Sequence, residues 1–229
     1  MNEFLNIINS PLCKTKAITR YSGTRQNQIE TLSDHVLDVA MMSYHIARNL
    51  IVRGVSVDIG LLLQKCIIHD VDEVLIGDIP RMTKYSSEEC HRALNNLAND
   101  TAKELSFDID GTDYTYTIWK DDKDATLEGT ILRVTDMLSV ANKVILEIEF
   151  HHNIGFFKVA TEISHYLADV SDKVRNNLND PIAIDYLIKI IDDTYEVMKS
   201  LIEEYRPKID QYNIYDEFSA KIINRRDKE

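Results

Sequence analysis

Apolar residues recur at every third or fourth position through long stretches of the chain from residue 31 onward, and this spacing constrains the fold most. In residues 31–53 they fall at Val36, Val39, Ala40, Ile46, Ala47 and Leu50. Such spacing places apolar side chains on one face of an amphipathic α-helix. The 229 residues include only 7 glycines and 4 prolines, so turn residues are scarce for a many-stranded sheet. The pattern predicts an all-α helical bundle.

Helices are predicted wherever this periodicity continues between capping or helix-breaking residues. The expected helices span residues 31–53, 58–70, 86–105, 127–150, 156–177 and 181–204. Thr31 or Ser33 suits the N-cap of the first helix, and Pro181 suits the first turn of the last. Pro207 is expected to break the last helix, so that a short charged extension follows from about residue 206. Without a repeat or linker, residues 1–229 are expected to form a single domain.

The stretch 107–120 is the one place where the sequence favours strands. Asp110 and Gly111 form an Asp-Gly pair between two short stretches of aromatic and β-branched residues. An Asp-Gly pair in this setting is typical of a tight hairpin turn. We therefore expect a short hairpin here, with an irregular loop as the alternative.

Charge and cysteine content exclude several classes of function. The formal net charge of −12 disfavours binding to a nucleic-acid polymer or an anionic membrane, but a local cation or metal still allows a small phosphorylated substrate. The three cysteines form no CxxC pair, which is typical of free thiols in a reducing compartment. Residues 1–12 have neither the basic start nor the apolar run of a signal peptide. A cytoplasmic protein is expected.

Two histidines and two aspartates lie beside apolar residues of the predicted helices. His69 and Asp70 follow the apolar run of one helix. His35 lies near the start of another, and Asp136 lies inside a third. Buried ionisable groups need partners, and one metal ion satisfies several of them at once. Two imidazoles and two carboxylates suit Mn, Co, Fe, Ni, Zn or Mg, and residue type does not choose among these ions.

Each of these residues also has a purely structural interpretation. A His-Asp pair is common by chance, and Asp136 could pair with Arg133 or Lys143 on its own helix.

Glu73 shares a helix face with the His-Asp pair if the helix continues for one more turn, where it could act as a general acid or base. Asp78 follows the break at Gly77, where a loop could present it to a ligand.

The order of these residues resembles the HD-domain phosphohydrolase superfamily, and more closely its YfbR-like 5′-deoxynucleotidase branch. The resemblance is carried by Arg20-Tyr21, Ser33-Asp34-His35, the block His69-Asp70-Val71-Asp72-Glu73-Val74-Leu75-Ile76-Gly77-Asp78-Ile79-Pro80, Lys84-Tyr85, and Thr135-Asp136-Met137-Leu138. It covers roughly residues 17–165, and the block from His69 to Tyr85 is its most specific part.

The resemblance implies a role for each matched residue. One divalent metal ion would be held by His35, His69, Asp70 and Asp136. Glu73 would handle protons for the attacking water, and Arg20 would grip the phosphate. Tyr21 would pack on the sugar, Asp78 would accept a hydrogen bond from the sugar 3′-hydroxyl, and Lys84 is a further candidate for phosphate contact.

The expected activity is removal of the 5′-phosphate from (deoxy)nucleoside monophosphates by a metal-dependent phosphohydrolase, with a homodimer as the assembly suggested by the resemblance. Tyr21 stands where the branch has tryptophan, so the preference for deoxyribose stays open. A deoxynucleoside triphosphate triphosphohydrolase is the first rival activity. It needs more cations along the phosphate path than Arg20, Arg25, Arg81 and Lys84 readily supply. A non-catalytic nucleotide-binding regulatory module and a purely structural bundle also stay open.

Overall fold

The computed structural model describes residues 2–121 and 126–211, and these residues form helices and no β-strand. The N-terminal part contains α1 (Glu3–Ile8), α2 (Pro11–Lys14) and the 3₁₀ turn η1 (Thr15–Ala17). The middle contains α3 (Leu32–Val52), α4 (Ile59–Ile68), α5 (Glu73–Ile76), α6 (Arg81–Lys84), α7 (Glu88–Asp110) and α8 (Tyr114–Lys120). The remainder contains α9 (Leu127–Ile145), the π-helical turn η2 (Leu146–Phe150), the 3₁₀ turn η3 (Ile154–Phe156), α10 (Phe157–Asn177) and α11 (Pro181–Gln211). The predicted all-α class is confirmed.

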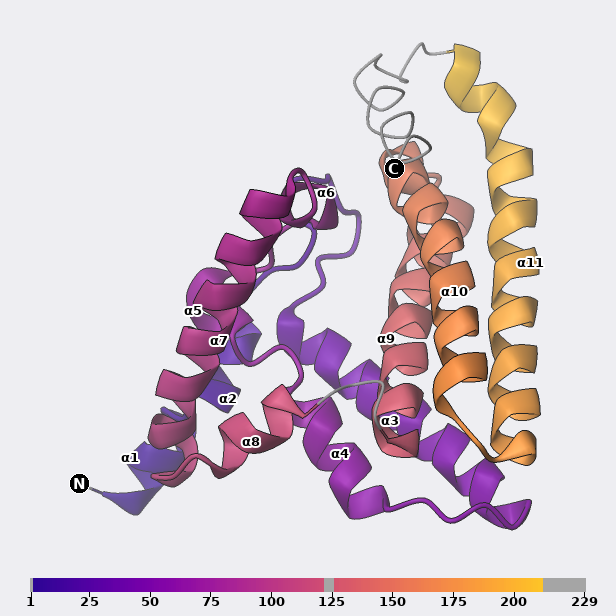
Figure 1. Ribbon diagram of the computed structural model, residues 1–229. Helices are drawn as coiled ribbons and strands as arrows, with labels where there is room; N and C mark the ends of the chain where they lie inside the picture. The colour runs from indigo at the N-terminus through magenta and orange to yellow at the C-terminus, as the bar shows by residue number, and fades with distance from the viewer. Residues whose placement is uncertain (1, 122–125, 212–229) are drawn as a thin grey trace.

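The long helices gather around α9. Helices α9, α10 and α11 stand side by side, and α3 and α4 pack against the α9 side of this group (Figure 1). Helix α7 lies on the other side of the molecule and packs against α8, which in turn contacts α4 (Figure 1). The main core lies between α3, α4, α9, α10 and α11 and includes Leu50, Leu62, Ile131, Leu167 and Leu187, all fully or almost fully buried. A smaller apolar cluster joins Val71 and Val74 to α7.

Capping residues explain where the helices that carry the candidate site begin. Thr31 and Asp34 form a reciprocal capping box at the start of α3, as the sequence suggested for Thr31. Asp58 caps α4 by accepting the Leu61 N–H, and Thr126 caps α9 by accepting the Gly129 N–H. These caps satisfy N–H groups that the first turn of a helix leaves without partners.

The predicted hairpin at 107–120 is wrong, because the stretch is helical on both sides of a sharp corner. Gly111 has a φ of 71° and ends α7 in the left-handed conformation, which is the common role of glycine after a helix. The Asp110 carboxylate accepts the backbone N–H groups of Thr112 and Thr115, so it stabilises the corner and the start of α8. The Asp-Gly pair therefore ends one helix and starts the next.

The expected break at Pro207 is also wrong, since α11 continues through it to Gln211. A proline removes one backbone donor and tends to bend a helix. Here it lies near the end of the helix, where Tyr205 and Ile209 remain buried against the core and hold the last turns in place. Residues 206–211 are thus part of α11, and the rest of the expected extension lies outside the described residues.

None of the helices in residues 2–121 and 126–211 has both the length and the apolar character needed to cross a lipid bilayer.

Candidate metal centre

The four expected metal ligands converge where α3, α4 and α9 meet. The Nε2 atoms of His35 and His69 lie 3.2 Å apart. Asp70 Oδ2 lies 3.0 Å from the Nε2 atom of His69 and 3.5 Å from that of His35. Asp136 Oδ1 lies 3.2 Å from His35 Nε2. Residues far apart in the chain thus bring two nitrogens and two oxygens into one cluster.

The other ring nitrogen of each histidine is held by a hydrogen bond that orients the ring. His69 Nδ1 lies 2.8 Å from the Cys66 carbonyl oxygen, which can only accept, so this nitrogen carries the proton. His35 Nδ1 lies 3.0 Å from Ser139 Oγ on α9. A donor bond from the Nδ1 side leaves the Nε2 lone pair for a metal, which is the usual arrangement of metal-binding histidines.

The donor set fits a divalent cation. Three of its residues, His35, His69 and Asp136, offer ligand atoms that all lie within 4.8 Å of one another. Both histidines are buried, whereas the side chains of Asp70 and Asp136 are 19% and 26% exposed. Burial opposes protonation of His35, but hydrogen bonds to Asp136 and Asp70 raise its pKa. The cluster therefore favours a positive charge, which a metal ion supplies without a proton.

Glu73 reaches the cluster through a turn rather than through a longer α4. Helix α4 ends at Ile68, and the Val71 and Glu73 N–H groups then donate to the Ile68 and Asp70 carbonyls in tight turns. Burial, and then the charges of Asp70 and Asp78, raise the pKa of Glu73 to about 10. A carboxyl group in this setting takes up a proton readily, and a cation at the cluster would draw the pKa back down.

Arg20 and Tyr21 approach the same cluster from the loop before α3. The Tyr21 N–H donates to Asp78 Oδ2 at 2.7 Å, which ties this loop to the turn that follows α5. Tyr21 has a φ of 54°, a left-handed conformation that costs a non-glycine residue roughly 1 kcal/mol or more. Arg20 pairs with Glu30 at 3.4 Å, and the charges of Asp70 and Asp136 also stabilise its guanidinium.

Three buried polar atoms in this region have no hydrogen-bond partner within residues 2–121 and 126–211: Arg20 Nε, Tyr21 Oη and Glu73 Oε2. Each comes from a residue that the sequence nominated for substrate binding or proton transfer. Buried polar atoms rarely stay unsatisfied, and a group of them in one place is typical of a site that a ligand completes. One donor, one hydroxyl and one carboxyl oxygen would suit a polar, anionic ligand.

Lys84 is a candidate whose charge acts on Asp72. It lies on α6, beside Asp72. Burial and the charge of Asp70 raise the pKa of Asp72 to about 6, and the charge of Lys84 acts in the opposite direction. Asp72 itself accepts a hydrogen bond from the Trp119 indole. Lys84 thus acts on Asp72, which is not one of the four converging donors.

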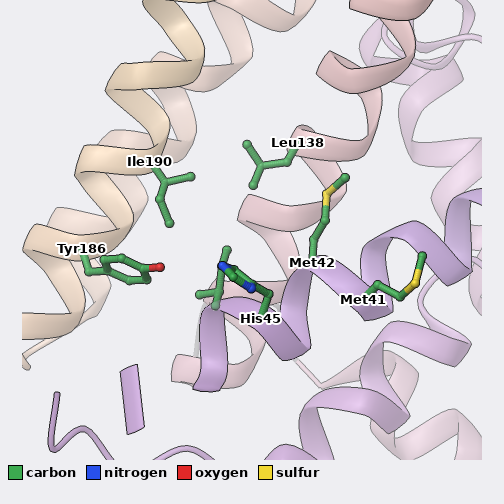
Figure 2. Close-up of a pocket in the computed structure, with 7 residues that line it drawn as sticks. Met41, Met42, His45, Leu138, Tyr186 and Ile190 are labelled. Carbon is green, nitrogen blue, oxygen red and sulfur yellow. The ribbon is translucent and has the colours of Figure 1, made fainter. Parts of the chain in front are cut away.

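A separate pocket opens between α3, α9 and α11, and its lining is mainly apolar. Figure 2 shows the side chains that surround it: Met41, Met42, His45, Ile46, Leu138, Tyr186 and Ile190. None of these seven residues is an expected site residue. One imidazole and one phenol among apolar side chains do not offer the donors that a divalent cation or a phosphate needs. The cluster of His35, His69, Asp70 and Asp136 therefore remains the candidate metal centre.

Sequence reasoning missed several polar residues that support the site, namely Glu30, Ser139, Lys143, Glu147 and Asn153. Ser139 is a small residue inside a helix and offers no distinctive pattern. Lys143 and Glu147 had a readable signal: a lysine and a glutamate four positions apart in a helix that is otherwise rich in apolar residues.

Solved structures share this architecture. The chain is similar to an HD-domain phosphohydrolase from Listeria innocua, at 23% identity and a TM-score of 0.66, over 88% of this chain and 94% of that one. A conserved hypothetical protein from Pyrococcus furiosus is 22% identical, with a TM-score of 0.61, over 84% of this chain and 99% of its own. An HD phosphohydrolase of cyanophage S-2L, bound to dA and one catalytic Zn²⁺ ion, is 12% identical, with a TM-score of 0.52, over 81% of this chain and 95% of its own.

These likenesses establish the fold, and a family match goes further. Comparison with curated proteins finds no match. The family described as 5′-deoxynucleotidase YfbR-like matches residues 8–213, a range that contains every candidate site residue. With this match, and with HD-domain phosphohydrolases among its structural neighbours, the chain belongs to the YfbR-like 5′-deoxynucleotidase family.

Proposed function

We propose that this protein is a divalent-metal-dependent phosphohydrolase that removes the 5′-phosphate from nucleoside monophosphates, with deoxynucleotides as the first substrates to test. The observation that carries the proposal is the convergence of two imidazole nitrogens and two carboxylate oxygens beside Arg20, whose Nε atom is buried. Family membership supports the same activity.

In this proposal, His35, His69, Asp70 and Asp136 hold the metal ion. Once bound, the ion supplies Lewis-acid activation of water and of the phosphate group. Arg20 binds the phosphoryl oxygens, because a guanidinium offers several N–H donors in one plane and stays charged. Its Nε atom, unsatisfied within the described chain, is one such donor.

Glu73 is the proposed acid and base of the reaction. Its Oε2 atom is buried beside the cluster, and a cation bound there would draw its raised pKa back down, so that the carboxylate could accept the proton that the attacking water gives up. It would return that proton to the nucleoside 5′-oxygen as the bond to phosphorus breaks. Water attacks phosphorus directly, so no covalent enzyme intermediate is needed.

Asp78 and Tyr21 are proposed to bind the sugar. Asp78 uses Oδ2 to accept the Tyr21 N–H, so a sugar hydroxyl would be accepted by its other oxygen. The Tyr21 ring is fixed against Phe156, with ring centroids 5.2 Å apart, and would present its buried hydroxyl toward the nucleotide. A hydroxyl there can accept a hydrogen bond from a ribose 2′-hydroxyl, or it can occupy the space that a 2′-hydroxyl needs. Parallel assays of AMP and dAMP distinguish these two outcomes.

A monophosphate suits the available cations better than a triphosphate does. Of the four basic residues considered, Arg25 is exposed, and Arg81 lies over the rings of Tyr85 and Tyr166 at 4.6 and 4.0 Å. The charge of Lys84 acts on Asp72. Arg20, by contrast, lies close enough to Asp70 and Asp136 for their charges to stabilise its guanidinium.

The deciding experiment incubates the purified protein with dAMP, AMP and dATP in the presence of Co²⁺, Mn²⁺, Mg²⁺ or Zn²⁺ and identifies the products. Inorganic phosphate and deoxyadenosine from dAMP support the proposal. Tripolyphosphate from dATP supports a triphosphohydrolase on the same fold. Binding of metal and nucleotide without turnover, in a protein whose Glu73→Ala variant behaves identically, would leave a regulatory module as the better account.

A further inference from the structure

The loop that carries Arg20 and Tyr21 is closed at its base by backbone pairing. Thr19 and Thr31 form an antiparallel bridge, and the Leu32 N–H donates to the Ile18 carbonyl at 2.8 Å. The Arg20 N–H donates to the Glu30 carbonyl at 3.0 Å. The loop 19–31 therefore leaves and rejoins the fold at one point, directly before the helix that supplies His35.

Gln26 braces the loop from within. Its side-chain amide nitrogen donates to the Arg20 carbonyl at 2.6 Å, and its amide oxygen accepts the Glu30 N–H at 3.2 Å. These two bonds connect the middle of the loop to both of its ends. A displacement of residues 26–28 is therefore transmitted to Arg20.

The far side of the loop is anchored by Glu147, a fully buried carboxylate in η2. Its two oxygens accept the Asn27 N–H at 3.0 and 3.2 Å and the Gln28 N–H at 3.1 Å. Asn153 donates to Glu147 at 2.8 Å and to the Arg25 carbonyl at 2.7 Å. One side chain thus satisfies two consecutive backbone donors of the loop.

Lys143 neutralises this carboxylate from one turn earlier on α9. Its buried ammonium lies 2.8 Å from Glu147 Oε1 and also donates to the Gln28 carbonyl. Burial opposes ionisation of Glu147, but hydrogen bonds from Lys143, Asn153, Asn27 and Gln28 lower its pKa to about 2. The carboxylate is therefore charged at every pH at which the protein would work.

One face of α9 and of the π-helical turn η2 that follows it carries both halves of the site. Asp136, Ser139, Lys143 and Glu147 follow one another at spacings of three or four residues, which align on one side of a helix. Asp136 belongs to the donor cluster and Ser139 orients His35. Lys143 and Glu147 hold the loop.

We propose that Glu147 is a positioning residue, which fixes the loop so that the Arg20 guanidinium and the Tyr21 ring face the metal cluster. The inference rests on the proposed function for its effect on turnover, whereas its effect on the loop is independent of that function. A purely stabilising ion pair inside α9 would not need two loop amides as further partners. The strained φ of Tyr21 also requires that neighbouring contacts define this segment.

The test compares Glu147→Gln with Glu128→Gln. Glu128 lies at the start of α9, and its Oε1 atom accepts the Asp58 N–H at 2.8 Å. Asp58 belongs to the loop between α3 and α4, which carries no candidate site residue. Three quantities are measured for each variant: amide hydrogen exchange, metal content, and kcat and KM for dAMP. If Glu147→Gln does not fold, Asn153→Ala takes its place, since it removes the side-chain bonds to Arg25 and Glu147 along with an acceptor for the Gly155 N–H.

We expect Glu147→Gln to speed amide exchange within residues 20–31, with metal content unchanged and kcat/KM for dAMP reduced by about 10- to 100-fold. Glu128→Gln should alter none of the three. Unchanged exchange in the loop, or exchange that rises equally throughout the protein, would overturn the inference. So would a loosened loop with normal kcat/KM. If the unmodified protein releases no phosphate from dAMP, the proposed function fails, and the exchange comparison alone decides whether Glu147 holds the loop.

Discussion

Replacement of Ser139 by alanine tests whether the histidine cluster binds metal through an oriented imidazole. Ser139 is buried on α9, and its hydroxyl lies 3.0 Å from His35 Nδ1. His35 is fully buried, so the substitution leaves a ring nitrogen with neither this partner nor water. Leaving a buried polar group unsatisfied costs about 1–3 kcal/mol, and the free ring can also rotate.

Loss of such a supporting hydrogen bond typically lowers metal affinity about 10- to 100-fold. A change of that size equals about 1.4–2.8 kcal/mol, which matches the cost of the unsatisfied nitrogen. We therefore expect the metal dissociation constant of Ser139→Ala to rise by about 10- to 100-fold, measured by calorimetry with Mn²⁺ or Co²⁺.

Ser106→Ala is the matched control. Ser106 is also buried, donates to the Thr112 carbonyl at 2.7 Å and accepts the Tyr116 N–H at 3.0 Å, but it lies on α7 away from the cluster. Both variants should lose stability, and only Ser139→Ala should lose metal affinity. Equal metal affinity in the two variants would refute the idea that Ser139 orients a metal-binding His35.

Three further predictions address other parts of the site. Glu73→Gln should lower kcat by about 10²- to 10⁴-fold while metal content stays normal, and steady-state kinetics with metal analysis would expose a merely structural Glu73. Tyr21→Phe removes a buried hydroxyl without a partner in the described chain, so the free energy of unfolding in urea should stay equal or rise by up to about 1 kcal/mol; a clear decrease would contradict this. Glu147 has its pKa lowered from 4.5 to about 2, so its stabilising contribution is present above pH 4.5 and is lost as the pH falls toward 2. Unfolding free energies at about pH 5 and about pH 3 should therefore differ less in Glu147→Gln than in the unmodified protein, and an identical difference would count against a charged Glu147.

Residues with a local signal could be nominated from the sequence. His69 and Asp70 end an apolar helix, and His35 and Asp136 lie close to apolar residues in their helices, so each stands out from its own neighbours. Helical periodicity likewise predicted α3, α4, α9 and α10 to within a few residues. The positions of the helices could thus be inferred without knowledge of tertiary contacts, whereas the metal-binding role of the four residues that the structure brings together stays a prediction.

Features that depend on tertiary contacts were missed or misread. An Asp-Gly pair suits a hairpin and a helix corner equally well, and only the caps at Asp110 and Gly111 decide between them. Pro207 is tolerated because Tyr205 and Ile209 pack against the core on either side of it. The role of Glu147 depends on backbone N–H groups 119 and 120 positions away in the chain, which no local pattern encodes.

Asp136, Ser139, Lys143 and Glu147 align on one face of α9 and the turn η2 that continues it. The number of residues between Asp136 and Glu147 therefore sets the distance between the metal cluster and the anchor of the loop. Glu147 lies eleven positions after Asp136, a span of about 16 Å at the α-helical rise. One residue inserted between them would rotate Glu147 by about 100° and turn it away from the loop, while the metal cluster at Asp136 kept its partners. A seven-residue insertion would nearly restore the direction but would move the anchor about 10 Å along the axis. The middle of α9 should therefore accept substitutions at partly exposed positions such as Val140 and Asn142 far more readily than any change in length.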